Sequence, residues 1–76
     1  MSPGPQQTRF YELAGDAAQV RLGDLSARLR RAGARTRMLA SLDRDGLYLL
    51  VAEAERLPDL DAPADCRVWT FASLGA

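Results

Sequence analysis

Five of the ten residues from 28 to 37 are arginines, and each guanidinium can donate paired hydrogen bonds to a phosphate or a carboxylate. The chain has ten basic residues, all of them arginine, so this arginine cluster carries half of its positive charge. The cluster consists of Arg28, Arg30, Arg31, Arg35 and Arg37. Arginines are also expected at the end of a helix, where they complement the helix dipole. Only Arg35 and Arg37, which follow Gly33, escape that explanation and favour a binding site.

Half of the ten acidic residues lie together further along the chain. They are Glu53, Glu55, Asp59, Asp61 and Asp65. The three aspartates match no calcium-loop spacing, so a solvated acidic loop is the simpler interpretation. This separation of charge also allows the acidic loop of one copy to meet the arginine cluster of another. The sequence leaves open whether the cluster is free or paired with the loop at 59–65.

Aromatic residues alternate with an arginine near the C-terminus. In a regular strand, Arg67, Trp69 and Phe71 share one face. Aromatics and arginines on an exposed sheet form a stacking platform for single-stranded nucleic acid, with Trp69 as the candidate stacking residue. We favour the alternative that Trp69 and Phe71 are core residues, because large aromatics dominate the cores of small domains.

Catalytic chemistry is poorly supported by the residue types present. With no histidine and no lysine, acid–base catalysis would depend on carboxylates, two tyrosines and one thiol. Cys66 has no histidine to activate it, and we expect a half-buried side chain at the start of a strand. No glycine-rich phosphate loop is present, and residues 43–46, Asp-Arg-Asp-Gly, match a hairpin turn better than a calcium loop. We therefore expect no enzyme, no cofactor and no metal site.

Composition bounds the class of protein. Seventy-six residues make one domain at most, and 47% hydrophobic residues favour a folded chain. A lone cysteine cannot form an internal disulfide, so self-association is the remaining common way to stabilise so small a core. The formal net charge is zero, and neither a membrane span nor a signal peptide is evident. These features predict a cytoplasmic protein, and the arginine- and alanine-rich usage is typical of bacterial G+C-rich coding sequence.

The first half of the chain predicts a strand followed by a helix. Residues 1–7 are rich in Pro, Gly and Gln and are expected to form a disordered tail, with a single domain over 8–76. A strand is expected over 8–13, and Asp16 is the expected helix N-cap. Apolar residues then recur with helical spacing up to Gly33, which is the expected C-terminal glycine. Residues 19–22 could instead form a second short strand, with a helix from Asp24.

The second half predicts three strands. Residues 38–42 and 47–54 flank the Asp-Gly turn and favour a hairpin, although 47–54 also matches helical spacing. As a strand, this segment is apolar on both faces, so Leu47, Leu49 and Val51 would form an interface on the side away from the core. Residues 57–65 contain two prolines and are expected to be a loop, and 67–74 is the last strand.

The resulting order, β-α-β-β-β, predicts a single small α+β domain with one helix packed on a mostly antiparallel sheet. The function expected from these features is a non-enzymatic interaction or regulatory module that forms a homodimer or docks on a larger protein. The alternative is a nucleic-acid-binding accessory protein that uses the arginine cluster. Neither hypothesis involves a membrane or a small-molecule substrate.

Overall fold

The computed structural model describes residues 6–74 of the chain. It has one helix and four strands, in the predicted order. They are β1 (Gln7–Ala14), α1 (Ala18–Arg31), β2 (Arg35–Ala40), β3 (Leu47–Ala54) and β4 (Arg67–Ala72). The α+β class is confirmed, and residues 47–54 are a strand rather than a helix. The predicted hairpin joins β2 and β3, but its first strand is 35–40 rather than 38–42, so residues 41–46 form a longer connection than a tight Asp-Gly turn. Gly46, with a φ of +76°, ends that connection.

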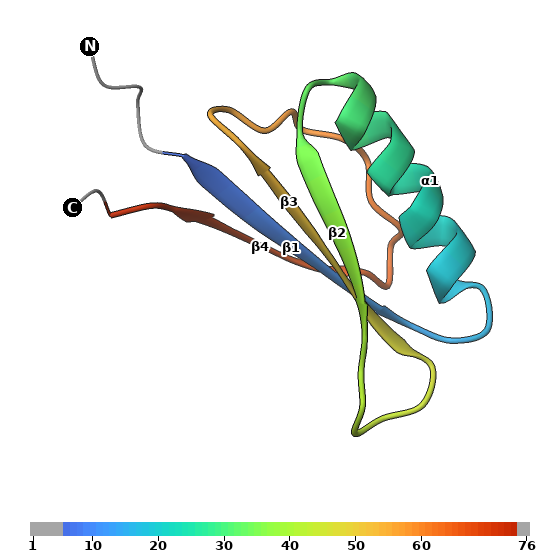
Figure 1. Cartoon of the computed structure of the whole chain (residues 1–76). Helices are drawn as coiled ribbons and strands as arrows, with labels where there is room; N and C mark the ends of the chain where they lie inside the picture. The colour runs from blue at the N-terminus through green and yellow to red at the C-terminus, as the bar shows by residue number, and fades with distance from the viewer. Residues whose placement is uncertain (1–5, 75–76) are drawn as a thin grey trace, which may run out of the picture.

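All neighbouring strands of the sheet are antiparallel, in the order β2-β3-β1-β4. Because β3 lies between β1 and β2, these two strands run in the same direction, and α1 connects them across one face (Figure 1). This unit is a split βαβ motif, which in the ferredoxin-like order is followed by a second helix before the last strand. Residues 55–66 form no helix here, so only one helix covers the sheet.

The core lies between α1 and the three strands β2, β3 and β1. Its largest fully buried side chains are Tyr11, Leu13, Leu22, Leu29 and Leu50. Alternate residues of each strand point to one face, and the apolar stripe of α1 packs on them. The helix is also tied to β2, because the Ser26 hydroxyl hydrogen-bonds the Thr36 hydroxyl at 2.7 Å.

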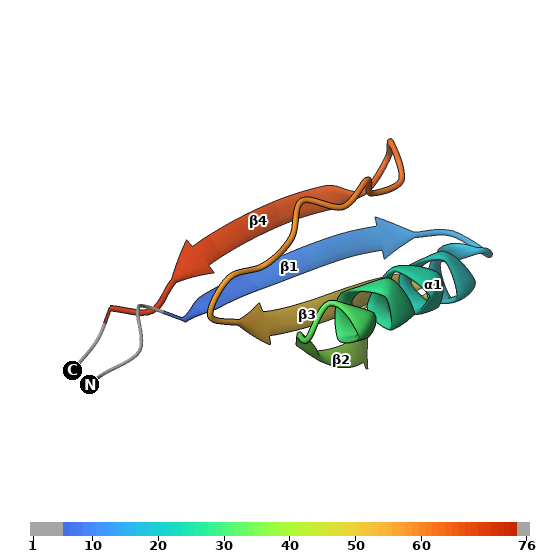
Figure 2. The same cartoon turned by 90° about the horizontal axis from the view of Figure 1, so that it is seen from above.

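The loop from 55 to 66 crosses the same face beside α1 (Figure 2) and packs against the core, whereas the residues of β4 remain exposed. Leu57 is buried there, and its backbone N–H donates to the Gln7 side chain at 2.7 Å. Arg9 holds the same loop, because its Nη1 donates to the carbonyl of Pro58 at 2.6 Å while its Nε donates to Thr70 at 2.8 Å. The helix and the loop together therefore cover this face over β2, β3 and β1, but not over β4.

Several predicted boundaries are corrected. The helix N-cap is Ala17, with no side-chain hydrogen bond, so Asp16 is not the cap. The chain leaves β1 through Gly15, whose carbonyl accepts from the N–H of Ala18, and this turn places Asp16 one residue too early. Residues 19–22 belong to α1, and Gln7 belongs to β1 rather than to a tail. Gln6 is also tied to the fold, because its carbonyl accepts from the N–H of Ser73 at 2.8 Å, and the remaining residues of the predicted tail, 1–5, lie outside the described part of the chain.

Two glycines near α1 predict opposite effects of the same substitution. Gly33 has a φ of +95°, which an alanine adopts only with strain, so Gly33→Ala should destabilise the fold by about 1 kcal/mol. Gly23 lies inside the helix, where an added Cβ meets no atom within 4 Å. Gly23→Ala should therefore stabilise the fold by roughly 0.5–1 kcal/mol. Urea unfolding of the two variants measures both signs, and equal effects would contradict the assignment of strain to Gly33.

Candidate functional site

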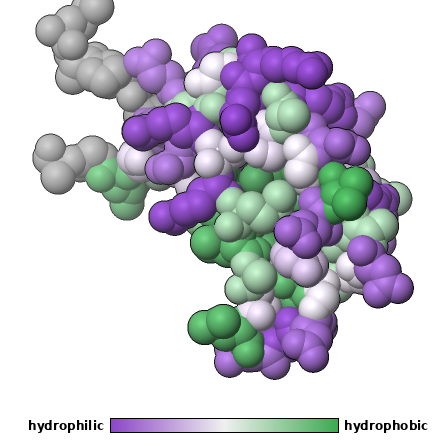
Figure 3. Space-filling model, turned by 45° about the vertical axis from the view of Figure 1, so that its right-hand side comes forward, coloured by the Kyte–Doolittle hydropathy of each residue, from purple (hydrophilic) through white to green (hydrophobic). Residues whose placement is uncertain are grey.

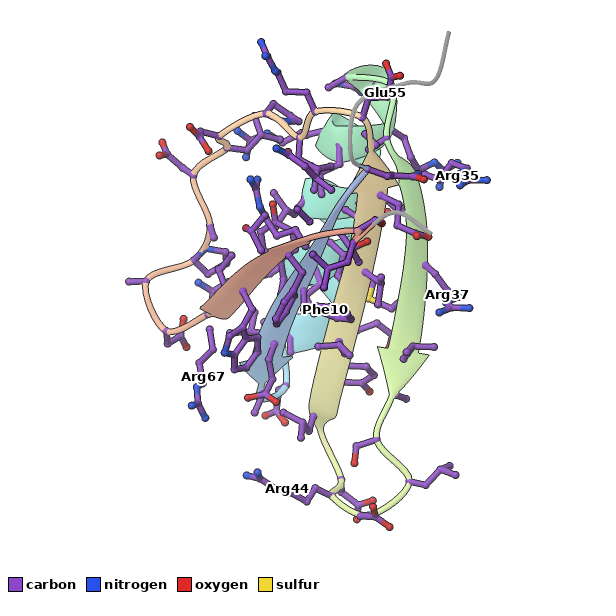
Figure 4. The ribbon with its side chains drawn as sticks, turned by 90° about the vertical axis from the view of Figure 1, so that its left-hand side faces the viewer. Phe10, Arg35, Arg37, Arg44, Glu55 and Arg67 are labelled. Atoms are coloured by element: carbon purple, nitrogen blue, oxygen red, sulfur yellow. The ribbon has the colours of Figure 1, made fainter. Side chains whose placement is uncertain are left out.

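The face of the sheet opposite α1 is covered by no other element of the described chain (Figures 1 and 4). We call it the open face. Strand register arranges its side chains in three rows across β2, β3, β1 and β4. The rows are Arg35, Glu53, Thr8 and Phe71; Arg37, Val51, Phe10 and Trp69; and Leu39, Leu49, Glu12 and Arg67. An antiparallel sheet that faces water is normally polar on that side, whereas this face carries seven large apolar side chains when Leu47 is included.

Aromatic rings occupy the β1–β4 half of the open face. Phe10 and Phe71 meet edge to face, with centroids 5.6 Å apart. The Arg67 guanidinium lies 5.3 Å from the centre of the Trp69 ring and 3.8 Å from the Glu12 carboxylate. The side chains of Phe71 and Trp69 remain 54% and 38% exposed. Their placement on the open face confirms that Arg67, Trp69 and Phe71 share one face.

The expectation that Trp69 and Phe71 are core residues is wrong. The helix reaches only β1, β2 and β3, and every residue of β4 is exposed, including Thr70, which points to the helix side of the sheet and accepts a hydrogen bond from Arg9. The two aromatic residues alternate with Thr70 and therefore point to the uncovered side. Composition alone suggested a core role because the chain has few other large side chains, but strand phase decides the matter.

The arginine cluster is divided between two sides of the molecule. Arg28, Arg30 and Arg31 are exposed in the last turns of α1. Arg35 and Arg37 lie on β2 and belong to the open face, and Figure 4 shows both side chains projecting from that edge. The chain reverses at Gly33, and the odd-numbered residues of β2 point away from the helix. The five arginines therefore do not form one binding site.

None of these five arginines makes an ion pair with another residue in the range 6–74. The helix side on which three of them lie is largely hydrophilic in the upper part of Figure 3. The acidic loop pairs instead with two other arginines. Asp59 lies 3.7 Å from Arg9, and Asp65 lies 3.5 Å from Arg21. Arg35 and Arg37 are thus unpaired cations beside an apolar surface.

The three predicted interface residues all lie on the open face. Val51 is 6% exposed at the centre of the middle row, while Leu47 and Leu49 are half-buried. With Leu39 from β2, the two leucines line an apolar hollow of about 270 Å³ that also touches Glu12. The central position of β3 in the sheet explains why this strand is apolar on both faces, as the sequence analysis expected.

Sequence reasoning missed Arg9, which is only 8% exposed. Its guanidinium contacts Thr70, Pro58 and the hydroxyl of Tyr11, the last at 3.3 Å. The alternation of side chains along a strand could have predicted its burial, because Arg9 shares a face with Tyr11 and Leu13. Arg9 is a structural residue that fastens the loop and β4 to the sheet, so it is not available to a ligand.

Cys66 lies half-buried directly before β4, as predicted. Burial raises the pKa of its thiol above the usual value, and the charge of Asp65 raises it further. The thiol is therefore protonated and weakly nucleophilic at neutral pH. Within residues 6–74, no three His, Cys, Asp or Glu side chains are grouped so that they could hold a metal ion. No helix in the same range has both the length and the apolar character needed to cross a membrane.

Comparison of the chain with protein-family models, with curated proteins and with solved structures finds no match. The geometry of the open face is therefore the basis for assigning a function.

Proposed function

We propose that this protein is a non-enzymatic binding module that forms a homodimer through the open face of its sheet. The observation that carries the proposal is the apolar character of a sheet face that no element within residues 6–74 covers. Contiguous exposed apolar surface on a small domain marks an interaction site. Aromatic residues and arginines, which dominate the β4 and β2 sides of this face, are the residue types enriched in interfaces.

The size of the open face suits a dimer of modest affinity. Four strands about 4.8 Å apart, over six residues that rise about 3.3 Å each, give a flat footprint of roughly 400 Å² per protomer. Stable interfaces bury about 600–1,000 Å² per partner, so a dimer built on this footprint lies below that range, among weak and transient interfaces. Area alone does not set affinity, but a face this small favours a dissociation constant of about micromolar or weaker. The lone half-buried thiol is compatible with a reducing cytoplasm as the site of action.

Sedimentation velocity of the wild-type chain over a dilution series tests the proposal. We expect the dimer mass at tens of micromolar and the monomer mass at the lowest concentrations. Trp69 is the only tryptophan, so its emission reports on this face directly and should shift to longer wavelength as the dimer dissociates. A monomer at every accessible concentration would remove the proposal.

A second function, binding of single-stranded nucleic acid, is favoured by one observation. Phe10, Trp69 and Phe71 share the open face with Arg35 and Arg37, so stacking rings and phosphate-binding cations lie side by side. Bases stack on such rings while arginines contact the phosphates. The face also carries Glu12 and Glu53, which oppose a polyanion, and for this reason the dimer is our first proposal.

Fluorescence anisotropy of labelled single-stranded and duplex oligonucleotides, at low and then at physiological salt, tests the second function. The divided cluster supplies matched variants. Replacing Arg35 and Arg37 with alanine should abolish binding of the single strand, whereas replacing Arg28 and Arg30 should leave it unchanged. Absence of binding even at low salt would eliminate this function, because phosphate contacts are strongest there.

A further inference from the structure

We infer that the two-fold axis of the homodimer runs parallel to the strands, so that Arg37 of each protomer stacks on the partner's Trp69. The inference rests on the proposed homodimer and adds its geometry. It follows from the positions of charged, aromatic and aliphatic side chains in the three rows of the open face.

Symmetry leaves two simple ways to stack the open face on a second copy. The two-fold axis must lie between the sheets, either parallel or perpendicular to the strands. A parallel axis between β3 and β1 keeps each row opposite the same row, with β2 facing the partner's β4 and β3 facing the partner's β1. A perpendicular axis places each strand opposite its own copy and reverses the order of the rows. Stacked sheets cross at about 30°, so the strands and rows of the two protomers lie directly opposite one another only near the centre of the face.

The parallel axis places complementary side chains opposite one another. In the middle row, Arg37 meets the partner's Trp69, and Val51 meets the partner's Phe10. In the next row, Arg35 meets the partner's Phe71. A guanidinium over an aromatic ring is attractive, and the attraction increases when the pair is removed from water. Arg35 and Arg37, which pair with no acid in the described chain, thereby acquire partners.

The perpendicular axis is less favourable. When it is centred on the middle row, it places Arg37 opposite the partner's Arg37, and two like charges facing across an interface repel. It sets Glu53 against the partner's Leu49, but the parallel axis sets Glu12 against the partner's Leu49, so this mismatch does not separate the two. The perpendicular axis stacks Phe10 and Trp69 on their own copies and gains Arg67 over the partner's Phe71, but that arginine already lies over Trp69 and beside Glu12, and Arg37 is left facing a like charge. The parallel axis therefore accounts for the arginines on β2 better.

The two axes predict opposite effects of one substitution on the dissociation constant of the dimer. With the parallel axis, Arg37→Ala removes two stacking contacts per dimer and should raise the dissociation constant by about tenfold to a hundredfold. With the perpendicular axis, the same change relieves repulsion and should lower the dissociation constant. Arg30→Ala, on the outer side of α1, is the matched control and should leave it unchanged. Sedimentation velocity at several concentrations measures the dissociation constants of the wild type and of the two variants.

A mixing experiment tests the pairing directly. The Arg37→Ala and Trp69→Ala chains each lack both contacts as homodimers, but the mixed dimer restores one intact contact under the parallel axis. Native mass spectrometry of the mixture, with one chain carrying a mass tag, should show mixed dimers in excess of the statistical half. A statistical mixture, or an unchanged or lowered dissociation constant for Arg37→Ala, would overturn the inference.

Cross-linking supplies an independent measurement if either alanine variant unfolds. Two variants are made in a Cys66→Ser background, one with Leu39→Cys and the other with Arg67→Cys, and are then mixed. Their two cysteines lie opposite each other only under the parallel axis, so a short bismaleimide should link the two chains of a mixed dimer. Failure to link it while the wild-type chain sediments as a dimer would reject the parallel axis and leave the perpendicular axis, or edge-to-edge pairing of β4, as the arrangement to map. A monomeric wild-type chain would reject the dimer itself, so the two failures are distinct.

Discussion

Replacing Leu49 with glutamate is expected to abolish the dimer while leaving a folded monomer. Leu49 lies on the open face of β3, beside Glu12 of β1, and points away from the core. The new carboxylate would lie next to Glu12 and, under the parallel axis, opposite the partner's Glu12. Like charges facing each other in an interface cost several kcal/mol, so the dissociation constant should rise by roughly a hundredfold or more.

Sedimentation velocity of the Leu49→Glu chain at about 50 µM, with circular dichroism as a check of folding, measures this effect. The matched control is Val20→Glu, because Val20 is 69% exposed on α1, on the other side of the sheet. That variant should dimerise like the wild type. Leu49→Arg should also weaken the dimer, but less than Leu49→Glu, since arginine at this position meets Glu12 rather than repelling it. A fully dimeric Leu49→Glu chain would place the interface elsewhere.

Replacing Arg9 with alanine is expected to cause the largest loss of stability among single changes outside the apolar core. The substitution removes hydrogen bonds to Thr70 and to the carbonyl of Pro58, together with the packing of the buried stem. Hydrogen bonds from a charged donor contribute about 1.5–3 kcal/mol each, so losing both should lower the free energy of unfolding by roughly 3–6 kcal/mol. Asp59 adds little, because its carboxylate is fully exposed at 3.7 Å from Arg9.

A small domain has only about 4–11 kcal/mol of stability at this length, so Arg9→Ala removes a large share of it. Urea unfolding followed by Trp69 emission, at one fixed protein concentration because dimerisation adds to stability, measures the change. Arg30→Ala is again the control, since Arg30 is exposed on α1 and should change stability by less than about 0.5 kcal/mol. Equal midpoints for the two variants would show that the loop holds to the sheet without Arg9.

The strand and helix order was predictable because its signals are local. The apolar stripe from Ala18 to Ala32 has the period of a helix, and Gly33 and Gly46 occupy positions that need a positive φ. The same kind of signal indicated that residues 47–54 were apolar on both faces. Residues 47–54 form a strand rather than the alternative helix. In the strand, alternate residues pack under α1 and the others lie on the open face.

The candidate site was predictable only in part. Leu47, Leu49 and Val51 were expected together on one face, and so were Arg67, Trp69 and Phe71. What the local pattern could not show is that these two sets lie on the same face, because they are adjacent only through β1, which pairs with both β3 and β4. Phe10, at the centre of that strand, was missed as a site residue for the same reason.

By itself, the sequence predicted the order of the elements, with a helix for 47–54 left as the alternative, and the phase of the last two strands, since these depend on residues within a few positions of one another. Only the tertiary structure decided which strand phases face α1, and hence that Arg35 and Arg37 separate from Arg28, Arg30 and Arg31. It also decided that Trp69 and Phe71 lie outside the core. Both outcomes depend on the strand order β2-β3-β1-β4 and on a helix that covers one face of the sheet, which are contacts between residues far apart in the chain.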